Sequence, residues 1–180
     1  MSSFDHERRV VRRTLGDTGP LNSTLCPVHG STQIYKGDLL FQDKVDGLRQ
    51  KGTSTADNYV YPFNQLSGVT HTLASNILLA AANFIGVAAW HSDSGVTEDL
   101  FIWVDHDFRF DLKNMKKVRP LYRVIPAGSG TTLFNQKVNL DTSGTTTKYI
   151  GVATSGGDLR SYVEFRLITL FQPHYKRLEW

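Results

Sequence analysis

A short apolar phrase with a glycine at its centre occurs twice in this chain, as Phe84–Ala88 and as Tyr149–Ala153. In both copies isoleucine and valine flank the glycine, and alanine closes the phrase. Aromatic and β-branched residues favour strands, and a glycine inside a strand marks a bend where another backbone passes close. The phrase therefore predicts two buried strands. The second copy is either a decayed half-repeat of the first or an independent occurrence of the same bent, buried strand.

Other segments extend this β prediction. Residues 107–113 alternate apolar and charged side chains, which is typical of a strand with one face in the core and one in water. Residues 100–104 are apolar on both faces, so one face should meet the core and the other a helix, a sheet or a subunit. Residues 56–63 form either an edge strand that ends at Pro62 or an aromatic loop. Further strands are expected at 33–36, 39–42, 117–125, 131–140 and 161–171, with a glycine-marked turn at 126–130.

One helix is expected, over residues 72–83, because apolar residues recur there at helical spacing and Thr70 or Thr72 can cap its start. The predicted fold class is mainly β: a single compact β-barrel or β-tulip-like domain with one short helix and an extended N-terminal arm. The expected organisation is an arm over 1–30, a β domain over 31–171 and a C-terminal tail over 172–180.

Charge and cysteine content limit the function classes. The 180 residues include 20 Lys and Arg against 17 Asp and Glu, a mixed balance of +3, so nucleic acid is not expected as a primary partner. The single Cys26 has no partner for a disulfide or a zinc site. The N-terminal residues lack the apolar core of a signal peptide, and no stretch approaches the length of a membrane span. We expect a soluble protein that is made in a cytosol and has no membrane partner.

Three clusters carry residue types used in catalysis or metal binding. Asp105–Asp107 could serve acid–base or metal chemistry, but its spacing does not set three ligands together and a turn explains it as well. His91–Gly95 has the ingredients of a nucleophilic site and equally those of a hairpin loop. Cys26–His29 lacks a second cluster. We therefore predict no catalytic residue, no cofactor and no metal, and a protein that is not an enzyme.

The aromatic residues leave one alternative open. A set of them could form a carbohydrate-binding platform or could belong to the core and to interfaces, and the sequence does not separate these possibilities. The set is Phe41, Tyr59, Tyr61, Trp90 and Trp103. A carbohydrate-binding module therefore remains an alternative function.

The order of the elements resembles that of the small capsid decoration (cement) proteins of tailed bacteriophages. The resemblance covers about residues 35 to 112 and rests on short motifs. They are Gly37–Leu40 with a following Asp-Gly turn, an alanine-rich helical stretch, Ile85–Ala88, a polar loop, Glu98–Val104 and Phe108–Phe110. The Arg-rich arm and the length of 180 residues exceed the smallest members of that family. The resemblance implies a compact β-barrel or β-tulip domain without enzymatic activity.

The resemblance also implies a role and partners. Such a protein binds the outer surface of an icosahedral capsid in the virion, contacts the major capsid protein and is usually a trimer. Its arginine-rich arm would then pair with carboxylates on the shell. The expected shell contacts are Arg8, Arg9, Val10, Val11, Arg12 and Arg13, and the expected subunit or shell packing residues are Trp103, Tyr175 and Trp180. Another virion component, such as a head fibre base, a neck protein or a tail protein, is the alternative within the same class.

Overall fold

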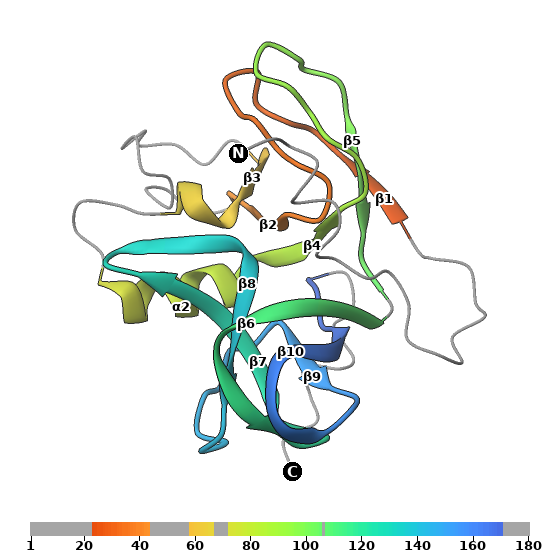
Figure 1. Cartoon of the computed structure of the whole chain (residues 1–180). Coiled ribbons are helices and arrows are strands. Elements are labelled where there is room, and N and C mark those ends of the chain that lie inside the picture. Colours follow the sequence, from red (N-terminus) through yellow and green to blue (C-terminus); the bar gives the residue numbers. More distant parts are fainter. Residues whose placement is uncertain (1–22, 44–57, 67–71, 106, 171–180) are drawn as a thin grey trace.

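The computed structural model describes residues 23–43, 58–66, 72–105 and 107–170. The fold is mainly β, as predicted, and contains a five-stranded sheet, a closed five-stranded barrel and a short helix (Figure 1). The expected arm up to residue 22, the Asp46-Gly47 turn and the tail over 172–180 lie outside the described residues.

The five-stranded sheet has the strand order β1-β5-β4-β2-β3, and all its neighbouring strands are antiparallel. Its strands are β1 (Ser23–Cys26), β2 (Leu39–Gln42), β3 (Val60–Pro62), β4 (Phe84–Ala88) and β5 (Leu100–Trp103). β3 is an edge strand that ends at its proline, which confirms the first of the two predictions for 56–63. A 3-10 helix, η1 (Phe63–Gln65), follows β3 directly.

The barrel has the strand order β10-β6-β8-β7-β9 and closes between β9 and β10. Its strands are β6 (Asp107–Val118), β7 (Arg123–Ser129), β8 (Thr132–Asp141), β9 (Gly151–Ala153) and β10 (Gly157–Leu167). Only β6 and β8 pair in parallel; the other described pairs are antiparallel. The alternation predicted at 107–113 is present, since Phe108, Phe110 and Leu112 are buried.

The two copies of the repeated phrase lie in different sheets. The first is β4, which is buried along its whole length, and the second leads into and forms β9 of the barrel. A Cβ atom on Gly86 would lie 2.2 Å from the carbonyl oxygen of Trp103 in β5. One on Gly151 would lie 2.4 Å from the carbonyl oxygen of Arg166 in β10. The close backbone approach predicted from the phrase is therefore present at both glycines.

The helix α2 (Leu73–Ala82) lies against β7 and β8 of the barrel (Figure 1). Thr72 caps it, because its hydroxyl oxygen accepts a hydrogen bond from the Ser75 backbone N–H at 3.2 Å. The side-chain amide of buried Asn76 donates to the Thr131 carbonyl oxygen at 2.7 Å and ties α2 to the β7–β8 turn. One hydrophobic cluster includes Phe41 and Phe84 of the sheet and Phe108 and Phe165 of the barrel, so the two β elements share a core.

Some local predictions were wrong. Residues 33–36 form no strand; only Ile34 makes an isolated bridge, to Ser92. The expected strand at 117–125 is interrupted by a turn over Arg119–Tyr122. The turn expected at 126–130 lies at Gly130–Thr131 instead, because β7 continues to Ser129. β1 starts at Ser23 and pairs with β5, so the range assigned to the arm includes a strand of the sheet.

Candidate functional site

The outer side of the β1–β5 pair is an exposed apolar surface. Leu25 lies directly opposite Phe101 in the antiparallel register, and the two side chains are 51% and 47% exposed. Leu100 and Ile102, which alternate with Phe101, are buried in the core. The prediction that 100–104 is apolar on both faces is thus confirmed, and the second face is turned to solvent within the described chain.

Two tryptophans extend this surface. Trp103 of β5 is opposite Ser23 of β1 and so lies on the same face as Leu25 and Phe101. Trp90, which is 60% exposed, and Trp103 line a hollow of about 260 Å³ together with Phe101. The Lys36 ammonium lies 5.7 Å from the centre of the Trp90 ring. We call Leu25, Trp90, Phe101 and Trp103 the β1–β5 face.

The β1–β5 face has the composition of a protein contact surface. Aromatic residues are enriched at protein interfaces, and a group of exposed large apolar side chains is costly to leave in water. The Trp103 ring packs on Phe108 with ring centres 5.6 Å apart, which anchors this face to the start of the barrel. Trp103, predicted as a packing residue, therefore lies in this face, partly buried against the core.

Asp107, the last residue of the Asp105–Asp107 cluster, is part of the barrel framework. Asp107 is nearly buried and its carboxylate accepts a hydrogen bond from the Arg166 guanidinium at 2.9 Å, across the β6–β10 pair. His106 lies outside the described residues. Across the described ranges, no three His, Cys, Asp or Glu side chains come together as a metal site requires. The Asp107–Arg166 pair supports a structural interpretation of Asp107.

The other two clusters form loops and a strand end. His91–Gly95 lies in a loop where Ser92 bridges Ile34 and Asp93 accepts a hydrogen bond from the Gln33 amide at 3.2 Å. The Ser92 hydroxyl is buried without a hydrogen-bond partner among the described residues, so no base contacts it as a nucleophile would require. Cys26 is buried in β1.

The five aromatic residues do not form one platform. Phe41 and Tyr61 are fully buried and stack in the core, with ring centres 5.9 Å apart. Trp90 and Trp103 lie on the β1–β5 face instead, so a five-residue carbohydrate platform is not formed. The remaining predicted site residues lie outside the described residues: Arg8, Arg9, Val10, Val11, Arg12, Arg13, Tyr175 and Trp180.

Asp141, at the end of β8, has a carboxyl group whose pKa is shifted by the loop that follows it. Partial burial acts to raise its pKa, but hydrogen bonds outweigh this and lower the pKa from 3.8 to about 2. They come from the Ser143 hydroxyl at 2.6 Å, the Thr146 N–H at 2.8 Å and the Ser143 N–H at 3.0 Å. The carboxylate therefore organises the loop over 141–146.

We expect Asp141 to stabilise the fold in a pH-dependent way. Because its pKa is lower in the folded chain than in the unfolded chain, its contribution is present above pH 3.8 and is lost as the pH falls toward 2. An Asp141→Asn chain should be less stable than the wild type by about 2 kcal/mol near neutral pH, and the difference should shrink below about pH 4. Urea unfolding of both chains over a pH series measures this. A difference that stays constant down to pH 2 would contradict it.

Comparisons with known proteins identify no relative, since no family model, curated protein or solved structure matches this chain. Within the described ranges, no helix is both long and apolar enough to pass through a lipid bilayer.

Proposed function

We propose that this chain is a structural virion protein of the decoration type, which binds the outer surface of an icosahedral phage capsid and clamps neighbouring major capsid protein subunits. The observation that carries the proposal is the β1–β5 face: Leu25 and Phe101, each about half exposed, stand side by side on paired strands of a sheet. A rigid apolar surface of this kind suits a contact between proteins. The order of motifs that resembles decoration proteins supports the choice of the shell as partner.

The position of this face fits a clamp with two points of contact. β1 is one of the two edge strands of the described sheet, and the residues that precede it in the chain carry the Arg8–Arg13 cluster. In the proposed arrangement the β1–β5 face packs on one capsid subunit while the arginines pair with carboxylates of a neighbour. Contacts that are weak singly add when many copies bind one lattice, and a trimer multiplies them again.

The proposal predicts that Phe101→Asp will prevent decoration. A carboxylate buried in an apolar contact has no partner there, and loss of a central aromatic anchor typically costs tenfold or more in affinity. Purified heads that lack the protein are incubated with wild type or variant, and bound copies are counted per head after sedimentation. We expect occupancy to fall about tenfold for Phe101→Asp and also for a chain without its first fifteen residues, with both chains still folded.

The matched control is Leu78→Gln on α2, where another leucine is 45% exposed away from the β1–β5 face. This control should decorate like the wild type. Wild-type occupancy by the Phe101→Asp chain would refute the docking role of the face. Failure of the wild type to bind heads at all would move the proposal to a head fibre base, neck or tail component, and images of particles with and without the protein would show its place.

A further inference from the structure

Two exposed leucines have a backbone conformation that leucine normally avoids. Leu121 and Leu159 have φ angles of 70° and 47°, in the left-handed region that favours glycine. The third residue of this kind in the described chain is Asn58, a residue type that tolerates the region. Leu121 is 80% exposed and Leu159 is 70% exposed, so neither is held there by burial of its own side chain. Strain of this kind gathers where a side chain has a function.

The turn that carries Leu121 is rigidly attached to the barrel. The Tyr122 N–H donates to the Arg119 carbonyl oxygen at 3.2 Å, which places Pro120 and Leu121 at the two central positions of a β-turn. Proline followed by a residue with positive φ is typical of a type II turn, where the second central position favours glycine. The Leu121 N–H also donates to Ala153 of β9 at 2.9 Å. A glycine would meet the needs of the turn without this strain.

Leu159 lies at the same end of the barrel. In the β6–β10 register Gly157 is opposite Val118 and Arg160 is opposite Lys116, with an irregularity between the two pairs that contains Leu159. Val118 is the last residue of β6, directly before the turn of Leu121. The two strained leucines therefore flank one end of the barrel.

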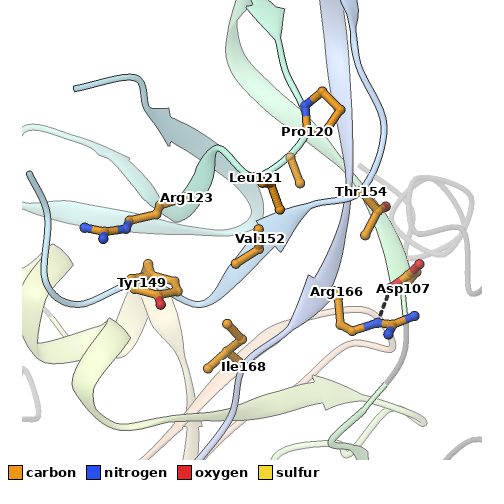
Figure 2. A pocket seen from close by; sticks show the side chains of 10 residues that line it. Asp107, Pro120, Leu121, Arg123, Tyr149, Val152, Thr154, Arg166 and Ile168 are labelled. Atoms are coloured by element: carbon orange, nitrogen blue, oxygen red, sulfur yellow. Dashed lines mark hydrogen bonds and ion pairs between the residues drawn. The ribbon is translucent and has the colours of Figure 1, made fainter. Parts of the chain in front are cut away.

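A pocket of about 600 Å³ opens beside Leu121 on the outer wall of the barrel (Figure 2). The register places Arg123, Val152, Arg166 and Asp107 in one row across β7, β9, β10 and β6, so their side chains share a face. Figure 2 shows Val152 at the centre, with Leu121 on one side of it and Ile168 on the other. The floor is apolar, and an arginine lies in the row on either side of it. We call this site the Leu121 pocket.

The Leu121 pocket has an excess of positive charge. Asp107 balances Arg166 at 2.9 Å. Arg123 is opposite Asp141 in the β7–β8 register, but the Asp141 carboxylate accepts hydrogen bonds from Ser143 and Thr146. The Arg123 guanidinium donates to the carbonyl oxygens of Gly144 and Thr146 and stacks on the Tyr149 ring, 5.1 Å from its centre. None of these three partners carries a formal charge. The charged side chains that line the pocket are therefore two arginines and one aspartate. An apolar ligand that bears a carboxylate matches both properties.

We propose that the Leu121 pocket docks an extended peptide segment of a partner protein in which acidic and apolar residues are adjacent. An apolar side chain of the segment lies over Val152 between Leu121 and Ile168, and a neighbouring carboxylate pairs with Arg123. A small molecule held in the pocket would leave Leu159 in water, whereas a peptide long enough to pass over the barrel end covers both leucines. The site lies on the barrel, so this inference does not depend on docking by the β1–β5 face.

An array of short synthetic peptides, varied in acidic, basic and apolar content, tests the proposal with the full chain as the probe. The wild type should select peptides with glutamate or aspartate beside leucine or phenylalanine over the same peptides with lysine. Leu121→Gly should weaken the selected binding about tenfold while the melting temperature stays equal or rises, because glycine relieves the left-handed strain. Leu159→Gly should weaken binding as well.

Two controls make the outcome decisive. Leu78→Ala removes an exposed leucine from α2 and should leave binding unchanged. Arg123→Gln should remove the preference for acidic over neutral peptides, with folding checked by circular dichroism. Absence of any selected peptide, or equal binding of the lysine peptides, would refute the proposal. Binding of a single-stranded DNA oligonucleotide with steep salt dependence, unaffected by Leu121→Gly, would instead assign the basic surface to nucleic acid.

Discussion

Replacement of Gly86 by alanine is expected to lower the free energy of unfolding by more than about 3 kcal/mol, a large fraction of the roughly 5 to 15 kcal/mol that stabilises an ordinary domain. The new Cβ would lie 2.2 Å from the Trp103 carbonyl oxygen and 2.8 Å from the Ile102 Cγ2 atom. The first neighbour is backbone inside a paired strand, so β4 and β5 must separate to admit the methyl group. Gly86 also has a φ of 149°, which a residue with a side chain rarely adopts.

Gly130→Ala is the matched control for this effect. Gly130 has a positive φ of 60°, but nothing lies within 4 Å of the position of a Cβ. The control carries the conformational cost alone, about 1 kcal/mol, while Gly86→Ala adds the clash. Urea unfolding followed by circular dichroism compares the two chains. Similar losses of stability in both chains would show that β5 moves away easily. The close approach to β5 would then not be the reason for a glycine at position 86.

The repeated phrase shows how far the sequence could predict this fold. Its glycine identified two close backbone approaches. A glycine inside a strand pattern is a local signal that a neighbouring strand leaves no room for a side chain. The pairing of each copy was not predictable, since Gly86 faces β5 and Gly151 faces β10 and only the tertiary fold determines such partners. The same holds for 107–113 and 72–83, where alternation and helical spacing identified β6 and α2 but not their neighbours.

The missed elements have physical reasons. At 117–125 the apolar content favoured a strand, but Pro120 fixes its own φ and cannot donate to a ladder, so the chain turns there. At 33–36 the side chains suit a strand, yet Tyr35 uses its backbone N–H to bond the Asp38 carboxyl group at 3.0 Å and forms a turn instead. Side-chain hydrogen bonds of this kind compete with sheet pairing.

The candidate sites were predictable only in part. Trp103 was predicted as a packing residue because it belongs to a strand that is apolar on both faces, and it lies on the β1–β5 face. Leu25 was missed because a single leucine between polar neighbours gives no signal of the strand opposite it. The Leu121 pocket was missed because its row joins Arg123 of β7 to Val152 of β9 and Arg166 of β10, two strands that follow much later in the sequence. The one local signal was Pro120 followed by leucine where a turn favours glycine.

Asp38→Ala should produce the second large loss of stability, about 3 kcal/mol. Asp38 is 1% exposed, and its carboxyl oxygens accept hydrogen bonds from the Tyr35 N–H at 3.0 Å and the Gln136 amide at 2.9 Å. Gln136 belongs to β8 of the barrel and Asp38 directly precedes β2, so this bond joins the barrel to the sheet. Removal of the carboxyl group leaves the buried Gln136 amide and the part-buried Tyr35 N–H without this acceptor, and a buried donor left in this way costs about 1 to 3 kcal/mol.

A double-mutant cycle separates the effect of the Asp38–Gln136 hydrogen bond from the effect of removing either polar group alone. If the Asp38–Gln136 bond couples sheet and barrel, Asp38→Ala and Gln136→Ala should each destabilise the chain. The loss of stability in the double variant should then be smaller than the sum of the two single losses by about 1 to 2 kcal/mol. Additive losses would show that the two residues act independently. A single unfolding transition in the wild type that splits into two in Asp38→Ala would be the strongest support, because it would show that the shared apolar core needs this polar bond to make the two β elements unfold together.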